Sequence, residues 1–201
     1  MARTNPYRRP DRFTTEAKKA GYPARSVFKL QEIDRRVRLL KPRQHVLELG
    51  AAPGSWARYV AERVGAEGRL LAVDLSPLAT TLPPHAKFFQ GDALDLEDEK
   101  LAEFAPYDVV LSDMAPTTTG NRLGDQTRSF ELFMRALAVA GKLSKVGGAF
   151  VGKIFMGEDL PVAREAVRKL YERHRLIRPE GTRTVSYEIF VVAEGRRAEV
   201  R

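Results

Sequence analysis

The sequence predicts an α/β protein built on an open, mostly parallel sheet, and three observations support this. Short apolar runs alternate with segments of helical periodicity along most of the chain. A length of 201 residues is typical of one globular domain. A composition of 43% hydrophobic and 30% charged residues fits a folded chain. Strands that alternate with helices form parallel sheets, and the last strand follows a short connection, so we expect it to run antiparallel.

The expected elements can be assigned in chain order. Val27, Leu30, Ile33, Val37 and Leu40 are spaced by three and four, which predicts an amphipathic helix over 24–40. Strands are expected over 45–49, 69–75, 86–92, 107–113, 148–155, 174–179 and 186–194. Further helices are expected over 55–64, 97–104, 125–145 and 159–173. The polar segment 114–126 follows a strand, so we expect a mobile loop at the carboxyl edge of the sheet.

The composition excludes several kinds of site. The chain has no cysteine, which excludes disulfides, thiolate metal sites and a cysteine nucleophile. Its three histidines are scattered, so we expect no metal. No window approaches the ~18 uncharged apolar residues of a membrane span, and the basic start lacks the apolar run of a secretory signal. We therefore expect a cytoplasmic protein with no membrane partner.

Positive charge is concentrated at the start of the chain. Residues 1–43 hold 13 Lys and Arg against 4 Asp and Glu, whereas the net charge of the whole chain is only +8. A second, weaker basic stretch runs from Arg164 to Arg183. Such blocks favour a polyanionic partner, most simply nucleic acid, although a solvated tail and helix face would look the same. We expect a flexible basic arm over 1–23 and a single domain over 24–201.

The segment ELGAAPGSW, residues 48–56, joins the first expected strand to the next helix. Gly50 and Gly54 would let the backbone approach a ligand closely. The segment lacks the G-x-G-x-x-G phosphate fingerprint and the Lys-Ser/Thr of a P-loop. Asp74 ends the second strand, where a carboxylate reaches a ribose diol, and Asp92 follows the third, where it can accept from an adenine amino group. Together they favour a nucleoside ligand.

Each of these residues also has a structural interpretation. Asp74 and Asp92 could be turn-making or capping carboxylates. Trp56 could contact the ligand, but a buried core tryptophan is the commoner case.

Four further residues are candidates for chemistry. Lys153 and Glu188 lie within apolar strands, where a charge costs several kcal/mol unless it is paired or belongs to a site. They could simply pair with each other as a structural ion pair. Lys29 could be a solvated helix lysine, and Asp113 could cap a turn.

These motifs together resemble one family. The chain is similar to the FtsJ/RrmJ (RlmE) family of ribosomal RNA large-subunit 2′-O-methyltransferases from about Arg25 to Ala193. The shared pieces are RS-x-x-KL (25–30), LGAAPG-x-W (49–56), Asp74, QGD (90–92), SDMAP (112–116), the strand around Lys153, and SYE (186–188). The resemblance implies a Rossmann-like methyltransferase fold with seven mostly parallel strands, an antiparallel final strand and helices on both faces.

The resemblance also implies S-adenosylmethionine as cofactor, with S-adenosylhomocysteine as product. Gly54 and Trp56 then lie at its methionine end, Asp74 at the ribose, Asp92 at the adenine and Asp113 near the sulfonium, while Gly50 belongs to the same turn. The family's catalytic tetrad falls on Lys29, Asp113, Lys153 and Glu188, with Lys153 as the general base.

The implied substrate is a ribose, expected to be that of a uridine, in 23S rRNA of the 50S subunit or its precursor, and the enzyme is expected to act as a monomer without a protein partner. Alternatives are a 2′-O-methyltransferase of tRNA or another RNA, and a catalytically silent RNA-binding ribosome-assembly factor. SDMAP differs from the Asn/Asp-Pro-Pro-aromatic motif of amino-group methylators. The absence of G-x-G-x-x-G disfavours a nicotinamide-dependent oxidoreductase.

Overall fold

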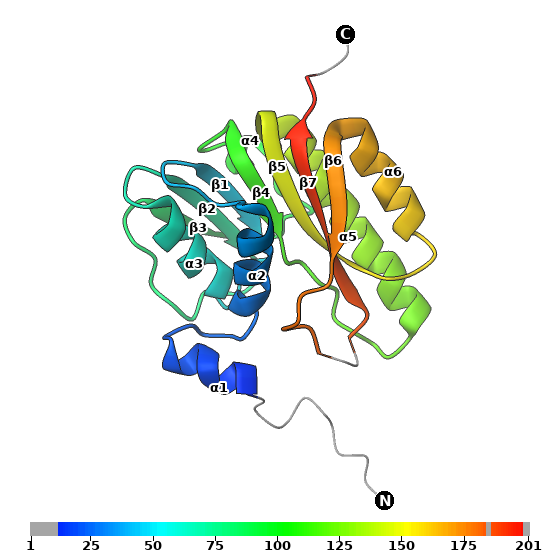
Figure 1. Cartoon of the computed structure of the whole chain (residues 1–201), viewed down its shortest axis with the longest axis horizontal. Helices are drawn as coiled ribbons and strands as arrows, with labels where there is room; N and C mark the ends of the chain where they lie inside the picture. Colours follow the sequence, from blue (N-terminus) through cyan, green and yellow to red (C-terminus); the bar gives the residue numbers. More distant parts are fainter. Residues whose placement is uncertain (1–11, 184–185, 199–201) are drawn as a thin grey trace, which may run out of the picture.

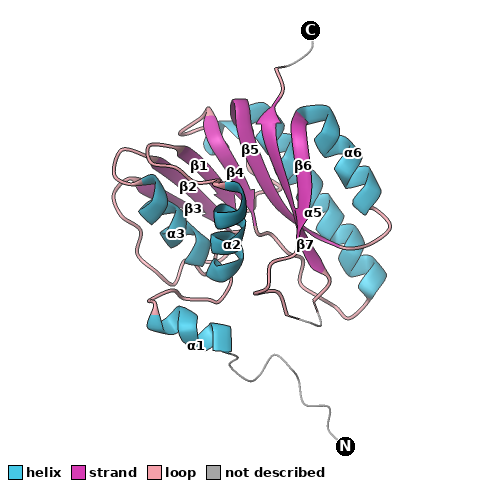
Figure 2. Cartoon of the chain, viewed as in Figure 1, coloured by secondary structure: helices cyan, strands magenta, loops and turns pink. Residues whose placement is uncertain are grey.

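Seven strands form one mixed sheet in the computed structural model, which describes residues 12–183 and 186–198. The strands are β1 (His45–Leu49), β2 (Arg69–Asp74), β3 (Ala86–Gln90), β4 (Tyr107–Ser112), β5 (Ser144–Phe155), β6 (Tyr171–Ile177) and β7 (Glu188–Arg196). They are arranged in the order β3-β2-β1-β4-β5-β7-β6. Strands β1 to β5 pair in parallel, and β7 runs antiparallel to both β5 and β6. The predicted fold class is confirmed (Figure 2).

Helices cover both faces of the sheet. They are α1 (Arg12–Lys19), α2 (Val27–Val37), α3 (Ser55–Val64), α4 (Asp98–Leu101), α5 (Arg122–Leu143) and α6 (Leu160–Leu170). In Figure 1, α2 and α3 lie in front of the sheet, and α5 and α6 lie behind it. Each pair encloses its own core against the sheet. Among the described residues, no helix has both the length and the apolar character needed to cross a membrane.

Strand periodicity decides which polar side chains share the front face of the sheet. Val46 and Phe190 belong to the core under α2 and α3. Alternate residues of a strand point to the same face, so Glu48 lies on the face of Val46 and Glu188 on that of Phe190. Lys153 lies directly opposite Phe190 in the β5–β7 pair and shares its face. Three charged residues from three strands therefore share the front face of the sheet.

The beginning of the chain differs from the expected flexible arm. Residues 1–11 lie outside the described residues, whereas residues 12–19 form helix α1. The ring of Phe13 packs 5.7 Å from that of Phe28 on α2, and Ala17 is buried. These contacts give the described part of the arm a fixed place beside α2.

Two other boundaries depend on contacts that periodicity does not reveal. Strand β5 begins at Ser144 rather than 148, because Ser144 pairs with Tyr107 before the register shifts. Gly147 adopts a φ of +80° within this irregular stretch, a conformation that favours glycine. Helix α5 begins at Arg122, since the Asn121 side chain accepts a hydrogen bond from the Gly124 N–H and caps the first turn. The expected loop therefore ends at residue 121.

Candidate functional site

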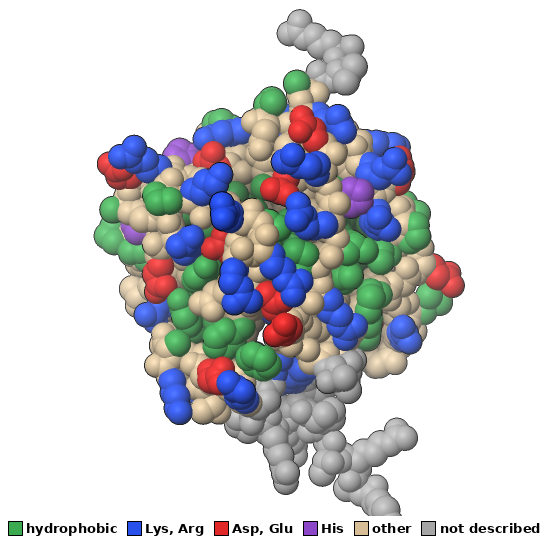
Figure 3. Space-filling view, in the orientation of Figure 1, with side chains coloured by type: hydrophobic (Ala, Val, Ile, Leu, Met, Phe, Trp, Pro, Cys, Tyr) green, Lys and Arg blue, Asp and Glu red, His purple; other side chains and the backbone are tan. Residues whose placement is uncertain are grey.

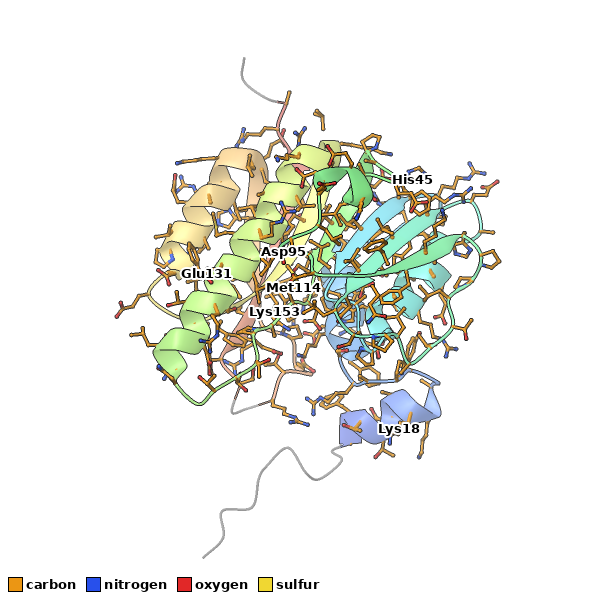
Figure 4. All side chains as sticks on the ribbon, turned by 180° about the vertical axis from the view of Figure 1, so that it is seen from behind. Lys18, His45, Asp95, Met114, Glu131 and Lys153 are labelled. Carbon is orange, nitrogen blue, oxygen red and sulfur yellow. The ribbon has the colours of Figure 1, made fainter. Side chains whose placement is uncertain are left out.

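A cavity of about 670 Å³ opens at the carboxyl edge of the sheet. The sheet order reverses direction between β1 and β4, and ligands of open α/β sheets bind at such a point. Figure 4 shows Met114 beside Lys153 at this edge, with His45 at the opposite one. Four of the predicted site residues line the cavity, and they are Gly50, Asp74, Asp92 and Asp113. The strand ends thus bring together residues from four parts of the chain.

Asp74 and Asp92 each shape a turn and also face the cavity. The two carboxylate oxygens of Asp74 accept hydrogen bonds from the backbone N–H groups of Ala52 and Ser76, both at 2.8 Å. Asp92 Oδ1 accepts one from Leu94 N–H, also at 2.8 Å. A carboxylate has about four acceptor positions, so both residues retain positions for a ligand. The structural and the ligand-binding interpretations are compatible here.

The two glycines of the turn are required by the protein's own packing. Gly50 has a φ of +81°, and a Cβ atom there would lie 2.7 Å from the backbone nitrogen of Met114. Gly54 has a φ of +107°, and a Cβ atom there would lie 2.6 Å from Thr80 Cγ2. We expected both glycines to admit a ligand, but the close neighbours are protein atoms. Among the described residues, Gly50 lines the cavity and Gly54 does not.

Trp56 lies beneath the site rather than in it. Its side chain is buried and packs against Phe190, with 5.7 Å between the ring centroids. The indole N–H donates a 2.8 Å hydrogen bond to the carbonyl of Ser26, the residue before α2. This placement favours the core interpretation, in which Trp56 fixes the start of the helix that carries Lys29.

Glu48 is a buried acid that our sequence analysis did not single out. It is 0% exposed, and neither carboxylate oxygen has a hydrogen-bond partner among the described residues. Burial, together with the nearby carboxylates of Asp113 and Asp74, raises the pKa of Glu48 well above its usual range. The signal was present, since Glu48 interrupts an apolar strand just before the glycine turn. Such a group needs a cationic or hydrogen-bonding partner.

The four tetrad candidates form two ion pairs on the front face of the sheet. Lys153 Nζ lies 3.0 Å from Asp113 Oδ1 and also donates to the backbone carbonyl of Asp113. Lys29 pairs with Glu188. All four side chains are at most 17% exposed. The alternative pairing of Lys153 with Glu188 is wrong, and Lys29 is not a solvated surface lysine.

The two ion pairs lie close together. Lys29 Nζ is 6.0 Å from the ring centroid of Phe190, and Phe190 pairs directly with Lys153 across strands β7 and β5. Both lysines therefore adjoin the same aromatic residue. Two lysine side chains and two carboxylates are thus gathered in a largely buried space.

A second cavity, of about 360 Å³, lies beside the Lys29–Glu188 pair. Lys29 and Glu188 line it, and Ala115 lines both cavities. Asp113 thus lines one cavity and the Lys29–Glu188 pair the other, whereas Lys153 lines neither. Among the described residues, no group of three or more His, Asp or Glu side chains could hold a metal ion.

Comparisons with known proteins agree on one family. The family model described as FtsJ-like methyltransferase matches residues 22–196. A protein of Sorangium cellulosum named ribosomal RNA large subunit methyltransferase E is 66% identical over 194 residues, 96% of this chain and 92% of the relative. A protein of the same name from Desulfatibacillum aliphaticivorans is 47% identical over 93% of this chain and 91% of its own.

Solved structures share the fold. A crystal structure from Plasmodium falciparum, described as a ribosomal RNA methyltransferase, matches with a TM-score of 0.75. It is 22% identical and covers 89% of this chain and 100% of its own. This similarity supports the arrangement of the sheet and its helices.

Proposed function

Because the chain belongs to the FtsJ-like methyltransferase family, we propose that it methylates the 2′-hydroxyl of a uridine ribose in 23S ribosomal RNA with S-adenosylmethionine. The observation that carries the proposal is that Asp113, the partner of Lys153, lines one cavity while the Lys29–Glu188 pair lines another. One cavity suits the methyl donor and the other the acceptor. The names of the relatives from Sorangium and Desulfatibacillum support the large ribosomal subunit as the source of the RNA.

The residues of the larger cavity fit S-adenosylmethionine. Glu48, two residues before Gly50, is buried and does not line the cavity itself, but its partnerless carboxylate would attract the positively charged amino group of the methionine part. Asp74 would accept hydrogen bonds from the ribose diol, and Asp92 from the adenine amino group. The cofactor would supply a methyl group made electrophilic by its positively charged sulfur. A carboxylate set of this kind fits a cationic nucleoside better than a phosphorylated one.

Lys153 is the proposed general base. A ribose hydroxyl is a poor nucleophile until its proton is removed, and a neutral amine can accept it. Asp113 accepts two hydrogen bonds from Lys153 Nζ, through its carbonyl and its carboxylate. A neutral amine that donates both of its N–H groups in this way keeps its lone pair for the hydroxyl proton. General-base assistance of this kind is worth ~10²–10⁴-fold in rate.

Lys29 is proposed to position the acceptor and stabilise the charge that develops on its oxygen. Glu188 fixes the ammonium group of Lys29 through their ion pair, in a space that is largely closed to water. A fixed cation at the place where negative charge develops lowers the barrier, because no reorganisation is needed. Alignment of the two reactants contributes further, up to ~7–11 kcal/mol in favourable cases.

Exposed basic residues are proposed to hold the rest of the RNA. Figure 3 shows Lys and Arg side chains gathered over the middle and right of the face that carries α2, β7 and β6. Arg35, Arg36 and Arg38, on or beside α2, are exposed, and the Arg164–Arg183 stretch adds further basic residues. Contacts of this kind to phosphates position RNA without reading its sequence, and they weaken as salt increases.

We also propose where the reaction takes place and in which assembly. It takes place in the cytoplasm, on the 50S subunit or its precursor, with the enzyme as a monomer.

One labelling experiment tests this function. The protein is incubated with tritiated S-adenosylmethionine and unmethylated large ribosomal subunits, and the labelled RNA is hydrolysed with alkali. A 2′-O-methyl group blocks attack of the ribose oxygen on the next phosphate, so the label is expected in a single alkali-resistant dinucleotide. Label in alkali-sensitive nucleotides would contradict ribose methylation. Bound cofactor without incorporation into subunits would direct the search to tRNA and, failing that, to an assembly factor without activity.

A further inference from the structure

Two walls of the larger cavity come from distant parts of the chain. One wall is the turn that follows β3, where residues 91–94 line the space. The other wall belongs to α5, and its lining residues are Arg128, Glu131 and Leu132. Positions three and four residues apart lie on one face of a helix, so Arg135 is the next residue on that face. A contact that fixes the turn against α5 therefore determines the shape of the cavity.

Arg135 joins the two walls through its guanidinium group. Its Nε donates a 3.0 Å hydrogen bond to the carbonyl of Ala93, and its Nη2 donates a 2.8 Å hydrogen bond to the carbonyl of Leu96. Nη1 lies 3.2 Å from Oδ1 of Asp98, the first residue of α4. A guanidinium group is planar and presents its N–H donors in a fixed geometry. One rigid group thus holds three points of the same segment.

The hydrogen bonds of the turn itself are local. The Asp92 carbonyl accepts hydrogen bonds from the N–H groups of Asp95 and Leu96, at 3.2 and 2.9 Å. Its Oδ1 accepts one from Leu94 N–H at 2.8 Å. Among the described residues, the hydrogen bonds that tie the backbone of 93–96 to a distant part of the chain both come from Arg135. The place of this turn relative to α5 therefore depends on that side chain.

We propose that Arg135 is a positioning residue for the methyl donor, because it holds the turn that carries Asp92 in the conformation that meets the adenosine part. The assignment rests on the proposed function, in which Asp92 accepts from the adenine amino group. Ordering a turn costs conformational entropy, and a turn that is ordered beforehand spares the ligand that cost. Arg135 is not among the residues that line the cavity, so it acts through the turn.

Arg135→Met tests this role, since methionine keeps a long side chain and lacks all the donors. A turn that is in place in only about a tenth of the molecules lowers the apparent affinity about 10-fold, so the Kd for S-adenosylhomocysteine should rise by about that factor. The KM for S-adenosylmethionine should rise as well. At saturating cofactor, kcat should stay close to that of the wild type, because other contacts hold the tetrad. An unchanged Kd would overturn the proposal.

Lys142→Met is the matched control. Lys142 lies about two turns further along α5 and pairs with the other carboxylate oxygen of Asp98, at 2.6 Å. The variant removes a positive charge from the same carboxylate but leaves the bonds to Ala93 and Leu96 in place. Its Kd for S-adenosylhomocysteine should equal that of the wild type. If both variants weakened binding equally, the charge beside Asp98 would explain both results, and the role of the carbonyl contacts would be overturned.

Arg135→Lys separates the charge from the geometry. Lysine keeps the positive charge, but its single nitrogen cannot span the two carbonyls as a guanidinium group does. The Kd for S-adenosylhomocysteine should lie between those of the wild type and Arg135→Met. This variant also provides the test if Arg135→Met does not fold. A Kd equal to that of the wild type would overturn the need for a group that bridges both carbonyls.

Hydrogen exchange without cofactor tests the turn itself. The amides of Leu94 and Leu96 are bonded within the turn, and in Arg135→Met they should exchange about 10-fold faster, as expected for a local opening. Amides of β1 should exchange as in the wild type. Unchanged exchange in the turn would overturn the proposal. Equal acceleration in β1 would also overturn it, because the variant would then destabilise the whole fold rather than the turn.

Failure of this inference is distinguishable from failure of the proposed function. If the wild type labels a ribose and Arg135→Met binds S-adenosylhomocysteine equally well, only the role of Arg135 is removed. A wild type that labels no ribose removes the function instead.

Discussion

Lys153 directs two hydrogen bonds to one residue, Asp113, through its backbone carbonyl and, at 3.0 Å, through its carboxylate. The other lysine of the site, Lys29, is held by a different carboxylate, that of Glu188. The two lysines are therefore fixed independently of each other. In the proposed mechanism, Lys153 takes the proton from the substrate while Lys29 remains a fixed positive charge.

Glu48→Gln is expected to stabilise the protein without cofactor and to weaken cofactor binding. The folded-state pKa of Glu48 is raised, so the folded protein binds its proton more tightly than the unfolded chain does. The penalty from Glu48 is absent below the unfolded pKa of about 4.3 and grows as the pH rises toward the folded-state pKa. The gain from the neutral amide should increase with pH in the same way.

Thermal unfolding at a series of pH values measures this effect. Each kcal/mol of stabilisation should raise Tm by about 2–4 °C for a chain of this size. Titration with S-adenosylhomocysteine should show weaker binding to Glu48→Gln, because the charged partner of the amino group is gone. A variant that is less stable at pH 8 than the wild type, or that binds the cofactor equally well, would contradict the role given to Glu48.

Asp74→Ala should weaken cofactor binding about 10- to 100-fold, since it removes a charged acceptor of ribose hydrogen bonds. It also removes the acceptor of the Ala52 and Ser76 N–H groups, so Asp74→Asn serves as a variant of nearly the same size. Asn should bind more weakly than the wild type but more tightly than Ala. Calorimetric titration with S-adenosylhomocysteine checks this, and unchanged affinity in Asp74→Ala would rule out the ribose contact.

Removing one member of the Lys29–Glu188 pair should cost more stability than removing both. Lys29→Met leaves Glu188 buried without its cation, a destabilisation of about 3–5 kcal/mol when a buried pair is broken. The double variant Lys29→Met with Glu188→Leu should recover much of this stability, yet remain unable to methylate RNA. Urea unfolding of the wild type, Lys29→Met, Glu188→Leu and the double variant gives the four free energies of a double-mutant cycle. Additive effects would show that the two side chains do not interact.

Trp56→Phe separates support of the site from cofactor contact. The variant lacks the indole hydrogen bond to the Ser26 carbonyl, so it should be less stable by about 1 kcal/mol or somewhat more. Cofactor affinity should not change, because Trp56 packs against Phe190 in the core under α2. A large drop in cofactor affinity at unchanged stability would place the indole in the binding site instead.

Local sequence signals predicted the elements whose boundaries depend on local features. Strand β1 and helix α3 have the predicted bounds of 45–49 and 55–64, since an apolar run, a glycine turn and an amphipathic period define them. Helix α1 and the start of β5 were missed. They depend on the contact of Phe13 with Phe28 and on the pairing of Ser144 with Tyr107, which are distant in sequence and leave no local pattern.

At the site too, local motifs predicted some features, and contacts between distant parts of the chain decided the others. Motifs identified the four charged residues of the tetrad, but not which lysine pairs with which carboxylate. In the β5–β7 register, Glu188 lies opposite Phe155 rather than Lys153, and this leaves Glu188 to Lys29 of α2. Register comes from pairing across the sheet, so one strand alone cannot reveal it. Glu48 could have been found by the argument already applied to Lys153, that of a charge inside an apolar strand.

A single-turnover measurement on Lys153→Ala tests the central claim most directly. The variant is mixed with excess unmethylated large subunits and labelled S-adenosylmethionine, and the rate of label transfer to RNA is compared with that of the wild type. The account predicts a rate at least ~10²–10⁴-fold lower, with the Kd for S-adenosylhomocysteine largely unchanged. Methyl transfer at close to the wild-type rate, with normal cofactor binding, would show that Lys153 does not take the proton.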